Sequence, residues 1–423
     1  MSRGKSFKSL ASYMKKDPNK YNIYTIKEKY GVDDDTKPGA TRYLSKELIL
    51  DINKINPNGN KTFILGGTGT GKTINYTIPQ IVNNDCDFIV VDSDGDVYNH
   101  TRQVLLDKGY TVLILDLRKG IKMEISEMGK KEHYITFKPF QQIESKDDLN
   151  ILAKKLTNII DYKETNARTK YQDGIFIYDL LDFANNHSIL DMEDFMGKVN
   201  PAYRPIYNKI APLFFNYSLH DIVNQRKDIN VDEFMDDKDR KALFIMENSW
   251  GGDYENDKLI PTLLLSYICD AISQREIIRP LHFIFNGTRE LSYMNFFDGI
   301  EQELFNINNK QNVGFSFCTQ TLADMNYYLE YALSTADIFM YMGTPIITDI
   351  EKIFPYLHND IYKTPKDIRK SEAIPRNCII RVKNEVSVTD NKYMPMDFNG
   401  ELSEKFKNDI DIVIDPNANG KDE

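Results

Sequence analysis

The stretch that decides the fold is Gly66-Gly67-Thr68-Gly69-Thr70-Gly71-Lys72-Thr73. It matches the pattern G-x-x-x-x-G-K-[ST], in which the backbone N–H groups of a glycine-rich loop wrap phosphates at a helix N-terminus. The β-like run Thr62–Leu65 precedes it, and Ile74–Ile81 can start the following helix. Lys72 would reach the β- and γ-phosphates, and the Thr73 hydroxyl would ligate Mg²⁺. The sequence therefore predicts a site for ATP and Mg²⁺, followed by a helix that Pro79 kinks or shortens.

Short apolar runs recur along the rest of the chain. Runs of this kind, bounded by turn residues, are typical of strands that are buried on both faces of a parallel sheet. Helical patterns lie between several of them, and this alternation predicts a doubly wound α/β architecture. We therefore expect a RecA-like P-loop nucleotide-binding domain with a mostly parallel sheet. The expected strands are Thr62–Leu65, Phe88–Val91, Val112–Leu115, Leu243–Met246, His282–Phe285, Gly314–Cys318, Ile338–Tyr341 and Cys378–Val382.

One long segment lacks such runs. Leu149–Ile160 and Ile175–Ala184 have helical spacing of apolar residues, and Tyr203–Phe215 is a further helix candidate. This pattern predicts an all-α insertion domain that interrupts the P-loop domain. The expected domains are a basic, loosely ordered segment 1–36, the P-loop domain 37–145 and 240–398, the all-α insertion 146–239 and an acidic tail 399–423.

Composition excludes several classes of protein. The net charge of −10 argues against a protein that coats nucleic acid nonspecifically, although it is compatible with a local basic surface. The basic N-terminus reads as a solvated end or as a tether to anionic lipid or nucleic acid. Four dispersed cysteines suit a reducing cytosol and exclude a disulfide framework. The longest apolar candidate, Leu259–Ile272, is interrupted by polar residues and proline, so we expect no membrane span.

A second candidate for the nucleotide site follows the run Phe88–Val91. Asp92 lies where a parallel strand delivers its carboxyl end, the edge at which open α/β sheets bind ligands. The alternating acids Asp92, Asp94 and Asp96 suggest a calcium loop, but the glycine and glutamate that such a loop needs are out of register. Two readings stay open for Asp92: an acidic strand-end turn, or a position near nucleotide or Mg²⁺.

Together these segments resemble the type IV coupling proteins, hexameric P-loop ATPases that feed DNA or protein substrates into conjugation and type IV secretion machines. The resemblance spans roughly residues 37–395, and the helical insertion falls where the family carries its all-α domain. The matching segments are Gly39–Ser45 with G-S-A-R-W, Asp92–Tyr98 and Gly109–Val112 with D-P-K-G-E-L-Y…G-Y-x-V, Phe137–Phe140 with N-P-F, Leu281–Phe285 with the Walker B strand, and Gly314–Gln320 with a strand that ends in Gln.

The resemblance implies function and partners. It implies a homo-oligomeric ring, a hexamer, that binds ATP and Mg²⁺ and recruits or translocates DNA or a relaxase–DNA complex toward secretion channel proteins. The DNA would be single- or double-stranded and held without sequence readout. Gln320 would sense the γ-phosphate. Family members commonly carry an N-terminal membrane anchor, whereas we expect no membrane span in this chain. We therefore expect a soluble form, either cytoplasmic or peripheral at the cytoplasmic membrane face through a partner.

The departures from the family concern hydrolysis. Where the family has Asp-Glu at the end of the Walker B strand, this chain has Asn286-Gly287. Asn286 can ligate Mg²⁺ weakly, but Gly287 cannot activate water. Glu290 is a candidate replacement, although a surface pair with Arg289 explains it as well. Asp92 and Asp94, which follow another strand, are further candidates. Only Lys310 could replace the arginine pair that usually precedes the strand 314–318.

Three functions therefore stay open. The first is a coupling-protein-like motor that hydrolyses ATP. The second is a hydrolysis-deficient adaptor or docking platform of the same machinery. The third is another ring motor, such as a packaging or filament ATPase. Asn286-Gly287 is the sequence feature that discriminates the first from the second.

Overall fold

In the computed structural model the chain divides into two compact units. The first unit is Met1–Cys86, Pro280–Thr288 and Gly314–Glu423, and the second is Asp87–Arg279 and Arg289–Val313. Each is described separately. The structure describes residues 17–57, 60–117, 131–137, 139, 143–160, 166–186, 195–210, 227–236, 238–246, 259–276, 278–287, 307, 312–322, 334–344, 346–357, 362–372, 377–383, 385 and 387–393.

The first unit is built on a mixed sheet in which β3 carries the P-loop. β3 pairs in parallel with β10 on one side and with β11 on the other, and β11, β12 and β13 then continue as antiparallel neighbours. β9 follows β10 on the opposite flank. The strands in spatial order are β13 (Val388–Asn391), β12 (Asn377–Val382), β11 (Ile338–Tyr341), β3 (Asn60–Leu65), β10 (Val313–Thr319) and β9 (Leu281–Asn286).

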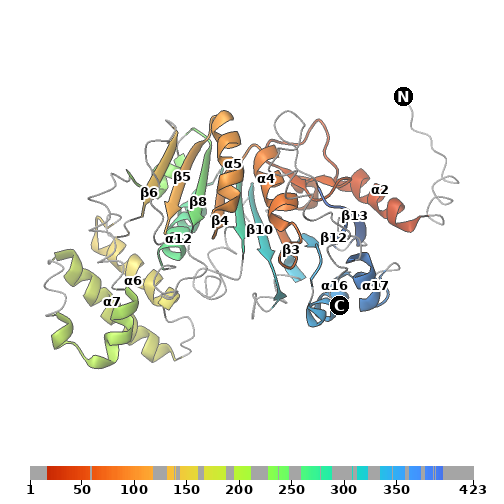
Figure 1. The fold of residues 1–423 in the computed structure, drawn as a ribbon. Coiled ribbons are helices and arrows are strands. Elements are labelled where there is room, and N and C mark those ends of the chain that lie inside the picture. Colours follow the sequence, from red (N-terminus) through yellow and green to blue (C-terminus); the bar gives the residue numbers. More distant parts are fainter. Residues whose placement is uncertain are drawn as a thin grey trace, which may run out of the picture. The chain divides into compact units, whose positions relative to one another are not determined.

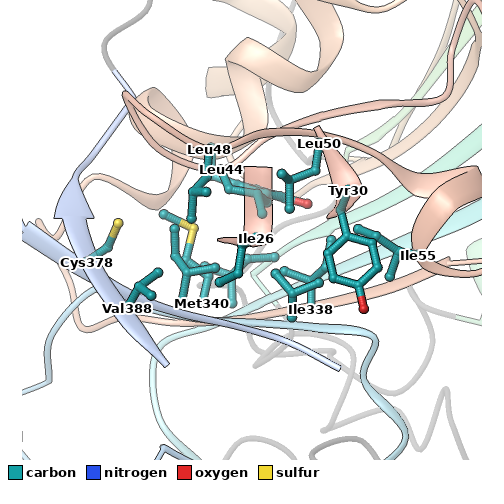
Figure 2. Close-up of a cluster of buried hydrophobic side chains, with 14 of the residues drawn as sticks. Ile26, Tyr30, Leu44, Leu48, Leu50, Ile55, Ile338, Met340, Cys378 and Val388 are labelled. Carbon is teal, nitrogen blue, oxygen red and sulfur yellow. The ribbon is translucent and has the colours of Figure 1, made fainter. Parts of the chain in front are cut away.

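Both faces of this sheet are packed. One apolar cluster includes Ile64 on β3 and residues of β11, β12 and β13. Figure 2 shows Ile338, Cys378 and Val388 of this cluster. The other face packs Phe63 and Phe339 against α16 (Ile347–Leu357) and α17 (Pro365–Glu372). Burial on both faces explains why the sequences of the central strands are continuous apolar runs.

The N-terminal segment is more ordered than we expected. Residues 18–30, inside the predicted loosely ordered segment 1–36, form helix α2 (Pro18–Tyr30), which Asp17 caps through Lys20 N at 3.1 Å. Asn19 exchanges two hydrogen bonds with the backbone of Thr389 on β13, and Ile26 and Tyr30 are buried in the cluster of Figure 2. Tertiary packing orders this helix despite its polar sequence; residues 1–16 lie outside the described residues.

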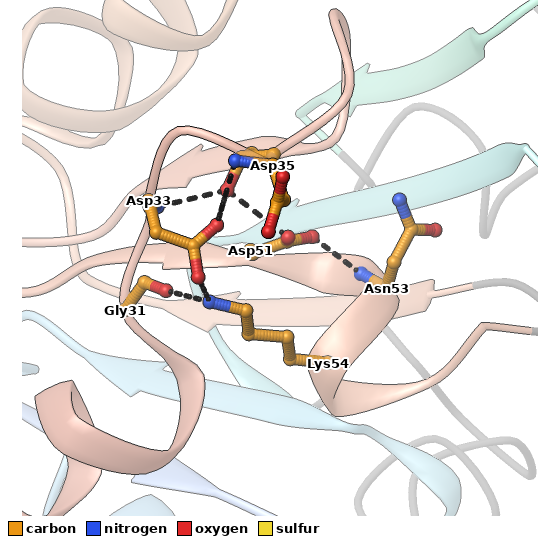
Figure 3. Close-up of polar contacts among 7 residues, drawn as sticks. Gly31, Asp33, Asp35, Asp51, Asn53 and Lys54 are labelled. Carbon is orange, nitrogen blue, oxygen red and sulfur yellow. Dashed lines mark hydrogen bonds and ion pairs between the residues drawn. The ribbon is translucent and has the colours of Figure 1, made fainter.

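The connection that follows α2 is held by charged side chains. Lys54 on α3 (Ile52–Ile55) donates to the Gly31 carbonyl at 2.7 Å and pairs with the Asp33 carboxylate (Figure 3). Asp51, which ends β2 (Ile49–Asp51), accepts from Thr36 Oγ1 at 3.1 Å. β2 pairs antiparallel with β1 (Thr41–Tyr43), and α2 contacts β2.

The second unit contains a parallel sheet. Its described strands run in the order β4 (Asp87–Asp92), β8 (Lys241–Met246), β5 (Thr111–Asp116), β6 (Glu132–Thr136) and β7 (Lys227–Asp228). Each of these strands pairs in parallel with the next. α5 (Asp96–Asp107) contacts β4 and β5 in Figure 1. Each of the eight predicted strands is a strand in the structure, which confirms the expected mostly parallel α/β architecture.

Helices dominate the described residues of the segment predicted as an insertion. α6 (Lys146–Ile160) and α7 (Ala167–Asn186) pack together (Figure 1), and α10 is Val231–Asp236. Within the candidate helix Tyr203–Phe215, residues 204–210 are helical and residues 211–215 lie outside the described residues. The buried Lys155 on α6 pairs with Asp270 of α12 (Leu259–Gln274) at 2.7 Å. The two-residue strand β7 is the exception to the predicted all-α content, because so short a strand leaves no hydrophobic pattern. The domain boundaries themselves stay predictions.

Among the helices in the described residues, none has both the length and the apolar character needed to cross a bilayer. The most apolar, α12, has 16 residues and includes Pro261.

Candidate nucleotide site

The P-loop starts where β3 ends, between the ends of its two parallel neighbours. Gly66 N donates to the Thr319 carbonyl of β10 at 3.0 Å, and Gly67 N donates to the Gly343 carbonyl after β11 at 2.7 Å. The two flanking strands therefore fix the first residues of the loop. This is the carboxyl edge of the parallel strands, as the sequence predicted.

Within the loop the backbone turns sharply. Thr70 N and Thr70 Oγ1 both donate to the Gly67 carbonyl, at 3.3 and 2.8 Å, and Thr68 and Gly69 are exposed at the tip. Gly71 has a φ of 87°, a backbone conformation that favours glycine, and a Cβ there would displace the side-chain amide of Asn75. The loop therefore turns sharply at its glycines, and its predicted role in wrapping phosphates stays a prediction.

Lys72 folds back over this loop. Its ammonium donates to the carbonyls of Gly66 and Gly67, the latter at 3.0 Å, and its side chain is half-buried. The positive charge therefore lies on the loop, where Lys72 was predicted to meet the phosphates.

The helix after the loop begins irregularly. Thr73–Thr77 is a π-helical turn, closed by the Ile78 N–H donating to the Thr73 carbonyl, and α4 (Ile78–Asn83) then runs for 6 residues. Pro79, in the first turn of α4, lacks an N–H for the preceding helical ladder. The predicted disturbance by Pro79 is confirmed as a wide first turn and a short helix.

Asn286 lies at the end of β9, beside this π-helical turn. Its Oδ1 accepts from Thr77 Oγ1 at 3.2 Å and lies 3.5 Å from Thr73 Oγ1. The structure thus brings together the two residues predicted to hold Mg²⁺. Both offer neutral oxygens, whereas Mg²⁺ is usually held by one or two carboxylates together with substrate phosphates and water. The pair fits a metal bound mainly through nucleotide phosphates, with little charge from the protein.

The next residue, Gly287, has a backbone conformation suited to glycine. Gly287 has a φ of 104°, and its N–H donates to the Cys318 carbonyl of β10 at 3.2 Å. An L-residue is strained at this φ, so a glutamate at this position would need a different backbone. The candidate replacements Glu290 and Lys310 lie outside the described residues.

Gln320 follows β10 and reaches the tip of the P-loop. Its Oε1 accepts from Thr68 Oγ1 at 3.1 Å. The predicted γ-phosphate-sensing side chain is therefore in contact with the loop, and its role as a sensor stays a prediction.

Asp92 belongs to the second unit. Its side chain is 1% exposed, and its Oδ2 accepts from Tyr98 N at 2.9 Å in the first turn of α5. Burial raises the pKa of this carboxyl to about 6, against the effect of its backbone hydrogen bonds. These contacts are those of a strand-end turn that caps α5. The proposed proximity of Asp92 to nucleotide stays a prediction.

Two segments that carry the family resemblance meet inside the first unit. Arg42 is 1% exposed and lies where a side chain on Gly314 would be, because a Cβ at residue 314 would overlap its guanidinium. His282 on β9 shares a hydrogen bond of 2.7 Å with Ser316, and burial together with Arg42 lowers the pKa of this imidazole. The Gly39–Ser45 segment thus has a packing role beneath the sheet.

One side chain at the loop was missed from the sequence. Lys392, just after β13, donates to the Thr70 carbonyl at 2.6 Å. Nothing in the local pattern VTDNK marks it, because the contact joins segments that are remote in the chain.

Comparison with known proteins supports both the family and the fold. The family model described as Type IV secretory system Conjugative DNA transfer matches residues 8–163, which include the P-loop. No curated protein matches the chain in sequence.

Several solved structures share the fold. The bacterial conjugative coupling protein TrwB in an unbound form is 13% identical with a TM-score of 0.56, covering 85% of this chain and 90% of that one. TrwB in complex with ADP and Mg²⁺ is 11% identical with a TM-score of 0.57, covering 85% and 91%. VirB4 of Thermoanaerobacter pseudethanolicus is 9% identical with a TM-score of 0.53, covering 87% and 99%. At these identities the likeness concerns the fold, and it confirms the predicted RecA-like class.

Proposed function

We propose that this chain, a relative of the type IV coupling proteins, is a nucleotide-binding component of conjugative DNA transfer or type IV secretion. The observation that carries the proposal is the P-loop geometry. Lys72 lies on the loop, and Thr73 faces Asn286 across 3.5 Å at the carboxyl ends of β3 and β9. That arrangement suits a nucleoside triphosphate with Mg²⁺, and TrwB has been solved with both ADP–Mg²⁺ and an ATP analogue.

In this proposal each residue has a separate task. The N–H groups of the loop and the Lys72 ammonium neutralise the phosphate charge. The Thr73 hydroxyl, beside Asn286, would hold Mg²⁺, and the ion would neutralise charge on the phosphates. Gln320 contacts the loop tip through Thr68 and responds to whether a γ-phosphate is present.

A specific observation favours slow or absent hydrolysis as the second candidate function. The position that would hold the activating glutamate is Gly287, with a φ of 104°. The neighbouring Asn286 supplies an oxygen without charge. A chain of this kind would bind nucleotide, change its shape or assembly on binding, and act as a docking platform for the transfer machinery.

The partners follow from the same proposal. We propose a homo-oligomeric ring, a hexamer, whose inner face holds DNA or a relaxase–DNA complex by backbone contacts that read no sequence. Contact restricted to a pore is compatible with a net charge of −10. The four cysteines are free and buried, which suits the proposed cytoplasmic location.

The test measures binding, turnover and assembly in the purified chain. We expect ATP binding that strengthens with Mg²⁺, and sedimentation as a ring with a nonhydrolysable ATP analogue. Absence of nucleotide binding would contradict the function, and a monomer under every nucleotide condition would contradict the ring. Turnover stimulated by single-stranded DNA supports a motor, whereas tight binding without turnover supports the docking platform.

A further inference from the structure

A lysine from the far end of the first unit reaches the P-loop. Lys392 follows β13, and its ammonium donates to the Thr70 carbonyl at 2.6 Å while its side chain is 6% exposed. Burying an ammonium is costly unless its environment compensates the charge, so a surface lysine would not take this position without a reason.

The backbone around Lys392 is held firmly by the segment between β1 and β2. Lys392 forms a β-bridge with Ser45, and Lys46 N donates to the Asn391 carbonyl at 2.9 Å. The Asp390 carboxylate accepts from Ser45 Oγ and from Glu47 N, each at 2.7 Å. These contacts fix the backbone position of Lys392. The direction in which its side chain extends toward the P-loop is therefore determined by the fold.

The contact has a geometric consequence within the loop. The Thr70–Gly71 peptide is trans, so the Thr70 carbonyl and the Gly71 N–H point in opposite directions. An ammonium that holds the carbonyl on one side therefore holds the N–H on the other. In a P-loop these N–H groups face the phosphates.

The contact also has an electrostatic consequence. Lys72 donates to Gly66 and Gly67, and Lys392 to Thr70, so two ammonium groups lie on one short loop. Burial lowers the pKa of Lys392, and the nearby Lys72 lowers it further, in spite of the opposite effect of Cys378. A bound phosphate chain would relieve the repulsion between the two ammonium groups.

We propose that Lys392 is a positioning residue of the nucleotide site, which orients the Thr70–Gly71 peptide toward the phosphates and adds a second positive charge to the loop. The inference rests on the proposed nucleotide binding. It makes the C-terminal strand β13 part of the site, so that the state of this strand and the bound nucleotide affect one another.

The test compares Lys392→Met, Lys392→Gln and the control Lys46→Met. Lys46 is an exposed lysine whose backbone contacts the same strand end. The measurements are the dissociation constant of ATP by calorimetry, its dependence on salt, and the thermal midpoint with and without ATP. We expect Lys392→Met to weaken ATP binding about tenfold, as the loss of one charge-assisted contact does, and to reduce both the salt dependence and the rise in Tm that ATP causes. Lys46→Met leaves all three unchanged.

If Lys392 stabilises the fold but has no role in binding, another result is expected. Lys392→Met then lowers the Tm equally with and without ATP, and the dissociation constant of ATP stays within about twofold of that of the original chain. That result overturns the inference and leaves the proposed function intact. Lys392→Gln serves if Lys392→Met does not fold, because its amide can still donate to Thr70 but carries no charge. ATP affinity unchanged in that variant overturns the electrostatic role. An unmodified chain that binds no ATP overturns the inference together with the function.

Discussion

The two sides of the nucleotide site, the P-loop Gly66–Thr73 and the strand end Asn286–Gly287, have departed from the family pattern to different degrees. The loop has its glycine backbone, its lysine and its hydroxyl in place, and β10 and β11 hold it. The strand end has the position of a Walker B segment without its charges, and its backbone adopts a conformation suited to glycine. Under the proposed function, nucleotide binding would depend on the loop and hydrolysis on the strand end, so the comparison predicts that either could be lost without the other.

The largest expected effect tests the intact side. Lys72→Ala removes the ammonium that we propose to meet the phosphates, and we expect ATP affinity to fall about 100-fold, or roughly 2.7 kcal/mol. Titration of ATP by calorimetry measures the loss, with Lys46→Ala as the matched exposed control. Affinity within threefold of the unmodified chain would show that the loop binds no nucleotide through Lys72.

A second prediction asks whether Asp92 replaces the missing carboxylate. Its pKa in the fold is about 6, raised from 3.8, so its protonated form stabilises the native state. That contribution is fully present below about pH 4 and is lost as the pH rises through about 6, and it amounts to at most about 2–3 kcal/mol.

Asp92→Asn cannot ionise, so we expect its unfolding free energy, relative to the original, to rise between about pH 4 and 7. Urea denaturation across this range measures the change, and ATP affinity at pH 7 is expected to stay the same. A pH-independent difference together with loss of nucleotide binding would instead place Asp92 at the nucleotide.

A third prediction partly restores the weaker side. Asn286→Asp places a carboxylate beside Thr73, and we expect the apparent Mg²⁺ affinity of the ATP complex to rise about tenfold, since hard cations prefer charged oxygens. Turnover stays near that of the original, because residue 287 offers no base. Titration of Mg²⁺ at fixed ATP gives the first value and phosphate release the second. A large gain in turnover would mean that another acid is already positioned for catalysis.

The smallest expected effect concerns Gly287. A Cβ at a φ of 104° is strained, and we expect Gly287→Ala to lower the free energy of unfolding by about 1–3 kcal/mol with less than a threefold change in ATP affinity. Urea denaturation and calorimetry separate the two. A variant of unchanged stability would show that this backbone can relax, and that a glutamate could be accommodated after all.

Much of the fold could be predicted because its central strands are buried on both faces. Strands in such an environment consist of continuous apolar residues, which can be recognised in the sequence. The strands that were missed are short or polar. β6 reads EHYIT and β13 reads VTDN, and neither shows an apolar run. Helix α2 was missed because tertiary packing and the hydrogen bonds between Asn19 and the Thr389 backbone stabilise it, and no local sequence pattern indicates these contacts.

The candidate site divides in the same way. The loop and the pairing of Thr73 with Asn286 were predicted, because a local motif and the parallel register determine them. Lys392 and the backbone of Gly287 were not, because a contact across the fold and a dihedral angle determine those.

The closeness of Arg42 and Gly314 has a consequence for sequence divergence. Because a side chain at 314 would overlap the Arg42 guanidinium, we expect the effects of substitutions at these two positions to be coupled. We expect a side chain at 314 to be better tolerated once residue 42 has been shortened than beside the buried Arg42. The order in which mutations arrive, and not only their identity, therefore constrains how this chain can diverge.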